Sequence, residues 1–233
     1  MAHHLTLRQI DKVAHDVCRL VFDRPDGFDF TPGQATDMAL DREGWREEFR
    51  PFTLTSQPED PHLEYVIKIY PEHAGVTNEI GTLMPGETVR IGAPWGAIRD
   101  AGPGTFIAGG AGVTPFIPIL RRRARDGTLG ASHLVFANRD ERDILLRDEW
   151  EAIPGLRTTF VLDAARPGYP QGPVDGDLLE ERVGDFSGIF YVCGPPPMTE
   201  AVIEALHDHG VSDVQIVREQ KPGQDERARL FAA

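Results

Sequence analysis

The pattern of apolar residues changes near Pro103, and this change restricts the chain to few folds. After Pro103, apolar segments typical of strands alternate with segments typical of helices. Predicted strands cover 105–108, 133–137, 158–162, 189–192 and 214–217, and predicted helices cover 114–124, 145–153, 178–183 and 197–209. This alternation predicts a mostly parallel sheet that is covered by helices.

The chain before Pro103 follows a different pattern. Short segments of β type, separated by turns that contain proline and glycine, are predicted at 17–22, 34–40, 51–56, 63–70 and 88–91, with one short helix at 76–83. Many short strands with such turns predict an antiparallel barrel or sandwich. We therefore predict two domains, 1–101 and 102–233, with a hinge at 100–104.

Composition argues against several classes of function. The 233 residues carry a formal net charge of −13, which disfavours a general nucleic-acid binder and adhesion to an anionic membrane. No apolar run approaches the ~20 residues that span a bilayer, and the N-terminus lacks a secretory pattern, so a cytoplasmic protein is expected. Two cysteines, Cys18 and Cys193, cannot ligate an ordinary iron–sulfur cluster, and no metal site is expected. Any redox chemistry then needs a bound organic cofactor.

The segment Phe106-Ile-Ala-Gly-Gly-Ala-Gly-Val-Thr-Pro-Phe116 leads a predicted strand into a glycine-rich turn. Glycines let a backbone approach a ligand closely, and a helix N-terminus offers N–H groups to a pyrophosphate. Thr114 is predicted to cap the following helix, with Pro115 in its first turn. A tight turn that binds nothing explains the glycines equally well, and Pro115 stands where the common dinucleotide pattern has its third glycine.

A second turn, Phe190-Tyr-Val-Cys-Gly-Pro-Pro-Pro-Met198, follows another predicted strand. By itself it is explained by a small buried thiol at Cys193 and by prolines that start a helix. Ligands of open α/β sheets, however, bind beyond the carboxyl ends of the strands. Because both turns are expected at that edge, together they favour a ligand site.

A third motif, Arg50-Pro-Phe-Thr-Leu-Thr-Ser56, lies in the first half of the chain. Alternation along a strand places Arg50 and Phe52 on one face and Thr53 on the other. Arg50 offers a bidentate fork for phosphate, Phe52 an aromatic surface and Thr53 a hydrogen-bonding hydroxyl. The alternative is a strand with a solvated arginine and a phenylalanine in the core.

Together, over nearly the whole chain and in this order, the three motifs resemble the ferredoxin–NADP reductase superfamily. They are most similar to its single-chain members that reduce flavodoxin or ferredoxin. The resemblance implies a flavin-binding Greek-key β-barrel over 1–101 and a Rossmann-like α/β domain that binds NAD(P) over 102–233. It also implies hydride transfer from NADH or NADPH to a bound flavin, which in turn passes electrons to another molecule.

The resemblance implies specific flavin contacts in the barrel. Arg50 holds the flavin phosphate, with Pro51 beside it among the flavin-binding residues, Phe52 stacks on the isoalloxazine, and Thr53 approaches flavin N5, where hydride arrives. The other implied flavin-binding residues are Val66, Lys68, Ile69, Gly75, Val76 and Thr77. The turn at 75–77 suits a pyrophosphate, which favours FAD over FMN. Phe52 stands where the family usually has tyrosine, so the hydrogen bond of a phenol is missing and weaker flavin binding is expected.

On the nicotinamide side, the resemblance implies that both glycine-containing turns contact the dinucleotide. The implied residues are Gly110, Gly112, Val113, Thr114, Asn138, Arg139, Cys193, Gly194, Pro195 and Met198. Cys193 lies beside the nicotinamide ring, and Glu219 corresponds to an acidic residue near the redox centre. Thr53, Cys193 and Glu219 are thus the predicted catalytic residues.

The segment Phe136-Ala-Asn-Arg-Asp-Glu-Arg-Asp143 bears on the choice between NADH and NADPH. Arg139 and Arg142 can clamp a 2′-phosphate, whereas the three acids repel it, and one of them can bond the free 2′-hydroxyl of NADH. A solvated charged turn is the alternative explanation. The balance favours NADH.

The chain has no cluster-binding ferredoxin domain, so the expected acceptor is a separate flavodoxin or ferredoxin, or a small molecule. A basic run of Arg121, Arg122, Arg123 and Arg125 either offsets the dipole at a helix end or docks an acidic carrier. Two other functions stay open. One is an electron-transfer subunit that binds flavin and nucleotide without turnover of its own, and the other is an interaction module that has lost the activity.

Overall fold

The computed structural model describes residues 2–96, 98–220 and 223. The described backbone groups into two compact units, which divide between Arg99 and Asp100, and Gln220 groups with the first. We call the first the barrel unit and the second the sheet unit. That residues 1–101 form the flavin-binding domain and residues 102–233 the NAD(P)-binding domain stays a prediction.

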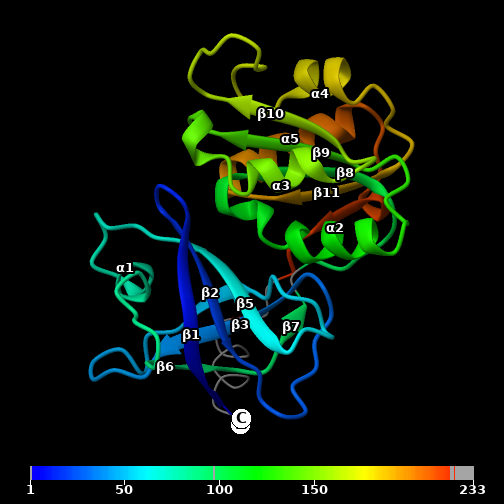
Figure 1. Cartoon of the computed structure of the whole chain (residues 1–233). Helices are drawn as coiled ribbons and strands as arrows, with labels where there is room; N and C mark the ends of the chain where they lie inside the picture. Colours follow the sequence, from blue (N-terminus) through cyan, green and yellow to red (C-terminus); the bar gives the residue numbers. More distant parts are fainter. Residues whose placement is uncertain (1, 97, 221–222, 224–233) are drawn as a thin grey trace. The chain divides into compact units, whose positions relative to one another are not determined.

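Among the described residues of the barrel unit, seven strands form one antiparallel sheet. They are β1 (His3–Ala14), β2 (Val17–Asp23), β3 (Gln34–Leu40), β4 (Arg50–Thr53), β5 (His62–Lys68), β6 (Thr88–Ile91) and β7 (Trp95–Gly96). The order is β4-β3-β6-β1-β2-β5, with β7 paired to β3. The end strands meet where Leu54 bridges Tyr65 and the Thr55 amide donates to the Glu64 carbonyl at 2.8 Å. The sheet therefore closes into the expected barrel (Figure 1).

Alternating side chains of these strands fill the barrel. Leu20 and Phe22 of β2, and Leu63, Tyr65 and Ile67 of β5, are almost completely buried, as the period of two in a strand requires. Strand β1 was not among the predicted strands. Only two of its twelve residues, Leu5 and Leu7, are buried, so β1 has little of the apolar signal of a strand.

Three predicted elements of the barrel unit end earlier than expected, and one of them is β5, which stops at Lys68 instead of residue 70. Helix α1 (Val76–Ile80) stops at Gly81, whereas the sequence predicted a helix to 83. Strand β4 stops at Thr53, whereas the sequence predicted a strand to 56, because the Leu54 amide makes a last bond to the Gln34 carbonyl of β3 at 3.1 Å and Leu54 and Thr55 then bond to β5.

The sheet unit contains a five-stranded parallel sheet in the order β10-β9-β8-β11-β12. The strands are β8 (Gly104–Gly109), β9 (His133–Asn138), β10 (Arg157–Leu162), β11 (Ile189–Cys193) and β12 (Ile216–Arg218). The helices are α2 (Phe116–Arg125), α3 (Arg147–Ala152), α4 (Gly176–Arg182) and α5 (Pro196–Asp208), with 3-10 turns η1 (Gly110–Val113), η2 (Glu141–Asp143) and η3 (Asp213–Gln215). The predicted parallel α/β architecture is confirmed.

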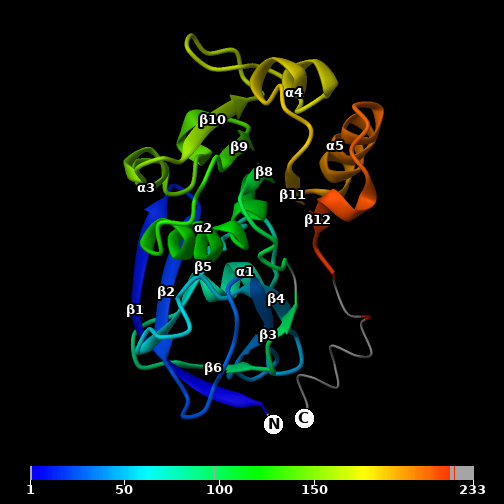
Figure 2. The ribbon, with the colours of Figure 1, turned by 90° about the vertical axis from the view of Figure 1, so that its right-hand side faces the viewer.

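Helices cover both faces of this sheet. Figures 1 and 2 show α2 and α3 on one face and α4 and α5 on the other. On the first face Phe106 stacks on Tyr191 with 4.1 Å between ring centroids, and Trp150 of α3 is fully buried. On the second face Ile107 and Val192 pack with Leu206 of α5. The central strands are thus buried on both sides, which explains their continuous apolar sequences.

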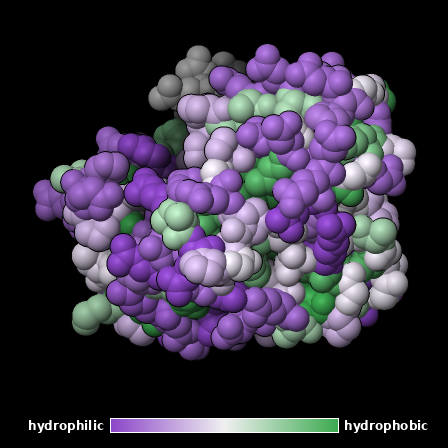
Figure 3. Space-filling view, turned by 90° about the horizontal axis from the view of Figure 1, so that it is seen from above, coloured by the Kyte–Doolittle hydropathy of each residue, from purple (hydrophilic) through white to green (hydrophobic). Residues whose placement is uncertain are grey.

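The surface is largely polar. Figure 3 shows a face on which hydrophilic residues predominate and hydrophobic residues form small separate patches, in keeping with a chain that is 26% charged. None of the helices in the described part of the chain combines the length and the apolar composition that crossing a membrane requires.

The burial of His133 predicts a pH dependence of stability. This side chain begins β9, is 4% exposed, and its Nε2 lies 2.9 Å from Thr159 Oγ1. Burial, assisted by the nearby charge of Arg157, lowers the pKa of His133 to about 4. An unfolded histidine titrates near pH ~6.5, so the unfolded chain takes up the proton first as pH falls. The contribution of neutral His133 to the free energy of unfolding is present in full above that pH. As the pH falls from about 6.5 to about 4, this contribution decreases by about 1.4 kcal/mol per pH unit.

Replacing His133 with asparagine should therefore flatten the decline in the free energy of unfolding between pH 6.5 and 4.5. Urea unfolding at several pH values measures it. The control is His62→Asn at an exposed position of the barrel unit, which should decline as the wild type does. An equal decline in His133→Asn and in the wild type would show that His133 does not carry this dependence.

Candidate dinucleotide and flavin sites

The two glycine-containing turns of the sheet unit lie side by side. Strands β8 and β11 are adjacent and parallel, and Ala108 is paired with Cys193 at their carboxyl ends. The strand order reverses between these two strands, which makes this edge the switch point where open α/β sheets bind ligands. The expected proximity of the turns is confirmed. Their contact with a dinucleotide stays a prediction.

Glycines allow this close packing. A Cβ added to Gly112 would lie 2.6 Å from the carbonyl carbon of Cys193 and 2.7 Å from Gly194 Cα, and one added to Gly109 would collide with the sulfur of Met198. Gly112 is therefore required by the contact between the turns, whatever binds there. Gly110 differs, because its φ of +51° is left-handed and a Cβ there would meet nothing within 4 Å. Open space at Gly110 suits a ligand that approaches the backbone.

Thr114 does not cap helix α2, which corrects the sequence prediction. The chain leaving β8 first winds into the tight turn η1, and this brings the Ala111 carbonyl within reach of Thr114 Oγ1, which donates to it at 2.9 Å. Helix α2 then begins at Phe116 with Pro115 as its N-cap and no side-chain cap. Thr114 therefore stabilises η1. Its predicted contact with the dinucleotide stays a prediction.

The turn after β11 is mostly closed to solvent at its start. Cys193 forms no disulfide and is 8% exposed, and Pro195 is the N-cap of α5. The next two residues, Pro196 and Pro197, have no N–H, so the first turn of α5 offers fewer amide donors to an anion than an ordinary helix does. Amide donors for a pyrophosphate are therefore expected from the η1 side.

Asn138 is the strongest sign of a ligand partner in the sheet unit. It ends β9, it is 6% exposed, and its Nδ2 donates to the Phe136 carbonyl at 3.4 Å. Its Oδ1 is buried without a hydrogen-bond partner. A buried acceptor without a donor is costly, so this oxygen fits a donor from a bound ligand. The next residue, Arg139, is exposed at the same strand end.

Two of the acids in this segment are engaged in the loop itself. Asp140 Oδ1 accepts from the Arg142 amide at 3.2 Å, and Asp143 Oδ2 accepts from the Asp140 amide at 3.1 Å, which together form a capping box around η2. Both carboxylates stabilise the conformation of the loop, so a structural role explains Asp140 and Asp143. Glu141 instead pairs with Arg147, Arg166 and Tyr169.

In the barrel unit, Arg50, Phe52 and Thr53 follow one another on β4, where Phe52 and Thr53 are paired with Thr36 and Ala35 of β3. The Arg50 side chain is 53% exposed; it donates to the Phe49 carbonyl at 2.8 Å and lies 3.6 Å from the exposed Glu48. Phe52 is half-buried against the barrel core, so part of its ring is accessible, whereas Thr53 is buried. An accessible guanidinium and ring on one strand fit a flavin nucleotide.

Three predicted flavin-binding residues lie at the end of β5 or just after it. Their side chains are buried or paired within the barrel unit. Val66 and Ile69 are buried, and Lys68 Nζ forms an ion pair with Asp16 at 2.8 Å. Strand β5 pairs with β2 along one edge, and at the other edge Glu64 and Tyr65 bond to Thr55 and Leu54, so the backbone after Tyr65 at that edge is the means by which these residues can contact a ligand.

The turn before α1 leaves room for a ligand. Gly75 has an extended backbone, and a Cβ there would meet nothing within 4 Å, so neither conformation nor packing requires a glycine. Val76 is buried and Thr77 is partly exposed beside it. The open space above Gly75 is compatible with the predicted phosphate contact.

The predicted catalytic residues come from both units. Thr53 belongs to the barrel unit, and Cys193 and Glu219 to the sheet unit. Val192 is paired with Arg218, so Cys193 and the half-buried Glu219 follow neighbouring strands at the same edge.

The basic run on α2 is neutralised by acids, which favours a structural role over a docking surface. Arg123 is only 8% exposed; its Nε donates to Asp100 at 3.0 Å and its Nη1 to the Thr128 carbonyl at 2.9 Å. All four arginines have a carboxylate partner: Arg121 with Glu149, Arg123 with Asp100, and both Arg122 and Arg125 with Asp126.

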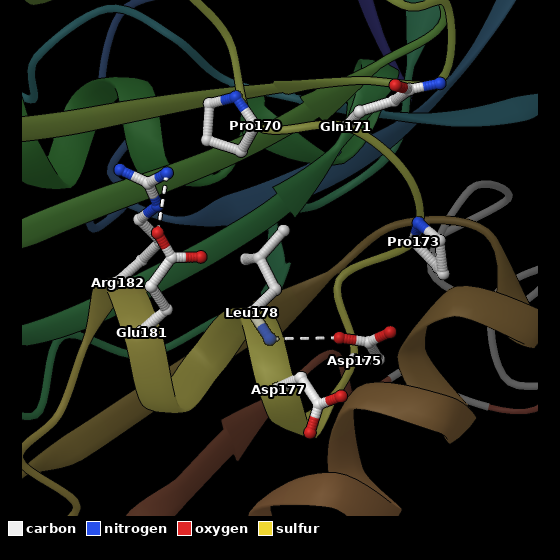
Figure 4. Close-up of a pocket in the computed structure, with 8 residues that line it drawn as sticks. All are labelled: Pro170, Gln171, Pro173, Asp175, Asp177, Leu178, Glu181 and Arg182. Carbon is white, nitrogen blue, oxygen red and sulfur yellow. Dashed lines mark hydrogen bonds and ion pairs between the residues drawn. The ribbon is translucent and has the colours of Figure 1, made fainter.

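A hollow of about 260 Å³ lies away from the predicted site residues, between the loop after β10 and helix α4 (Figure 4). Three of its lining side chains, Asp175, Asp177 and Glu181, are acidic. Asp175 caps α4 by accepting from the Leu178 amide at 3.0 Å. Because carboxylates repel a pyrophosphate, we assign neither cofactor to this hollow.

Comparison with known families gives two matches. Residues 4–99 match the oxidoreductase FAD-binding domain, and residues 106–204 match the oxidoreductase NAD-binding domain. Each match falls almost entirely within one unit of the structure.

Similar proteins include the reductase component of propane 2-monooxygenase from Rhodococcus jostii, which is 31% identical over 228 residues. That match covers 89% of this chain and 60% of the Rhodococcus protein. NADH-cytochrome b5 reductase 1 from Aspergillus terreus is 30% identical over 240 residues, covering 92% of this chain and 80% of the other. This chain therefore spans about three fifths of one relative and four fifths of the other.

Solved structures are similar over almost the whole chain. The cytochrome b5 reductase domain of Ulva prolifera nitrate reductase superimposes with a TM-score of 0.81 at 25% identity, covering 93% of this chain and 96% of that one. A ferredoxin NADP+ reductase from Neisseria gonorrhoeae with bound FAD and NADP has a TM-score of 0.79 at 18% identity, covering 92% and 96%, and shares the fold.

Because the two turns are in contact, a methyl group added at Gly112 should destabilise the protein more than one added at a glycine outside this contact. Gly112→Ala places a Cβ against backbone atoms of Cys193 and Gly194, which cannot rotate away, so the sheet unit should lose roughly 1–3 kcal/mol of stability. The control is Gly188→Ala, where a Cβ meets nothing within 4 Å, and its effect should stay within about 0.5 kcal/mol. Urea unfolding measures both, and equal stability of the two variants would refute the packing argument.

Proposed function

Because this chain belongs to the ferredoxin–NADP reductase family of NAD(P)H-dependent FAD oxidoreductases, which pass electrons to an acceptor, we propose that its acceptor is a separate carrier protein or a small molecule. The motifs favour flavodoxin or ferredoxin as the carrier. The names of the relatives add cytochrome b5 and an oxygenase component as candidates.

One observation carries the functional assignment. The glycine turn after β8 packs directly on the turn after β11, at the switch point of a parallel sheet, within the part of the chain that matches an NAD-binding domain. Beside it, Asn138 Oδ1 is buried without a donor, as expected for a residue that bonds a ligand. The site is therefore suited to a dinucleotide.

The residues of this chain bind and orient, and the cofactor supplies the redox chemistry. FAD, when bound, accepts a hydride from NAD(P)H and releases electrons to an acceptor. In our proposal Arg50 binds a phosphate oxygen through its guanidinium fork, Phe52 presents its ring, and Thr53 offers a hydrogen bond. Hydride transfer needs no proton from a side chain, so alignment of two rings is the main task of the protein.

The decisive experiment follows the absorbance of the flavin. Purified protein should be yellow, and NADH or NADPH added without oxygen should bleach it. Reoxidation by flavodoxin, ferredoxin, cytochrome b5 or ferricyanide, measured in parallel, identifies the acceptor class. Protein that is yellow but is bleached by neither nicotinamide would contradict the proposal and support an electron-transfer subunit without turnover of its own.

Arg50 should dominate the binding of the flavin phosphate. Arg50→Gln removes a charged hydrogen-bond donor worth about 1.5–3 kcal/mol, so the dissociation constant for FAD should rise by about tenfold or more. The matched control is Arg46→Gln, which removes the same charge four positions earlier, at another exposed arginine paired with Asp41. Fluorescence titration of the apoprotein measures both constants. Equal affinity in the two variants would remove Arg50 from the flavin site.

A further inference from the structure

Three side chains meet at the carboxylate of Glu141 in the sheet unit, and none of these four residues is among the predicted cofactor-binding or catalytic residues. Tyr169 Oη donates to Glu141 Oε1 at 2.7 Å, and the guanidinium groups of Arg147 and Arg166 both pair with the same carboxylate. The hydrogen bond from Tyr169, followed by that from Arg147, holds the pKa of Glu141 below its usual value, so this residue is an anion at neutral pH. We call these four residues the Glu141 cluster.

The cluster stands beside the strand end that is expected to receive the adenosine ribose. Glu141 follows β9, and Arg166 and Tyr169 follow β10, its parallel neighbour. The two loops are joined by backbone hydrogen bonds from Asp163 to the Asn138 carbonyl at 3.0 Å and from Ala164 to the Arg139 carbonyl at 3.2 Å. The cluster is therefore fixed next to Asn138 and Arg139, the predicted dinucleotide contacts.

Contacts in the core also fix the backbone next to Arg147. Leu146, just before it, has a left-handed backbone with φ of +55°, which is rare for a residue with a side chain. Its carbonyl accepts from the Trp150 amide at 3.1 Å, and the indole of the fully buried Trp150 donates to the Leu145 carbonyl at 2.7 Å. The start of α3 is thus anchored in the core, which places the backbone of Arg147 where its guanidinium pairs with Glu141.

Without Glu141, these groups would make a binding site for phosphate. Two guanidinium groups and a phenol hydroxyl converge on one point, and arginine forks are the preferred partners of phosphate oxygens. Arg166 is 54% exposed, so its guanidinium is accessible from solvent. Arg147 has a second carboxylate partner, Glu151 at 3.0 Å, whereas Tyr169 and Arg166 are oriented by Glu141.

We propose that Glu141 determines the choice of dinucleotide by occupying, with its own carboxylate, the place that the 2′-phosphate of NADPH would take between Arg147, Arg166 and Tyr169. The inference rests on the proposed function, because it assigns the adenosine end of the same dinucleotide site. The chain accordingly uses NADH in preference to NADPH. Asp140 and Asp143 do not share this role, because their carboxylates cap η2.

The test measures the affinities for adenosine 2′,5′-bisphosphate and adenosine 5′-monophosphate by calorimetry, using the whole chain. The two nucleotides differ only in the 2′-phosphate, and their binding is measured without any redox reaction of the flavin. The wild type should bind the monophosphate more tightly. In Glu141→Gln, the ratio of the two affinities should move towards the bisphosphate by about tenfold, as a charged hydrogen bond gained by the ligand implies.

Two further variants make the result specific. Glu151→Gln makes the same change of charge at the other carboxylate on Arg147 and should leave the ratio near that of the wild type. Adding Arg166→Gln to Glu141→Gln should abolish the gain, because the exposed guanidinium is then gone. If Glu151→Gln shifts the ratio as much as Glu141→Gln, or if the double variant keeps the gain, the proposal is wrong.

Failure of this inference is distinguishable from failure of the proposed function. A wild type that is bleached by NADPH in preference to NADH, and that binds the bisphosphate more tightly, is an NAD(P)H oxidoreductase in which Glu141 does not exclude the 2′-phosphate. Arg139 would then be the better candidate for a 2′-phosphate partner. A protein that nicotinamides do not bleach contradicts the proposed function, while the ratio of nucleotide affinities still tests Glu141.

Discussion

The steric contact between Gly112 and the backbone of Cys193 and Gly194 is the constraint on which the proposed dinucleotide site depends. The parallel pairing of β8 with β11 places both turns at one edge of the sheet. They can touch only because the residue at the contact, Gly112, has no Cβ. Once they touch, η1 is held with Gly110 facing open space, and the end of β9 with Asn138 lies one strand away. The geometry of the site is thus fixed by backbone packing, and few side chains are needed to shape it.

Much of the sheet unit was predictable, because strands buried on both faces have continuous apolar sequences and helices alternate with them. The barrel unit was harder. Strand β1 has one short buried stretch in a largely polar segment, and β4 ends where the chain changes its pairing partner, which no local pattern encodes. Thr114 was assigned to the wrong turn because the sequence does not distinguish η1 from the first turn of α2.

The candidate site residues can be identified as sequence motifs, whereas the networks of contacts around them cannot. Arg50, Phe52 and the two glycine turns stand in short segments that carry their own pattern. The partners of Glu141 do not, because Arg147, Arg166 and Tyr169 reach it from other loops and only the folded chain brings them together. For the same reason, the sequence does not show that Arg121 and Arg123 of α2 pair with Glu149 and Asp100, which lie far from them along the chain.

The pairing of Arg123 with Asp100 also determines where the sheet unit can be separated from the rest of the chain. Asp100 is its first residue, and the Tyr191 hydroxyl binds the adjoining backbone by accepting from the Ala101 amide at 2.8 Å and donating to the Gly102 carbonyl at 2.6 Å. A fragment that starts after these residues leaves a guanidinium buried in the core with no counter-ion, and an unpaired buried charge destabilises strongly. The connecting peptide is therefore part of the folded body that follows it.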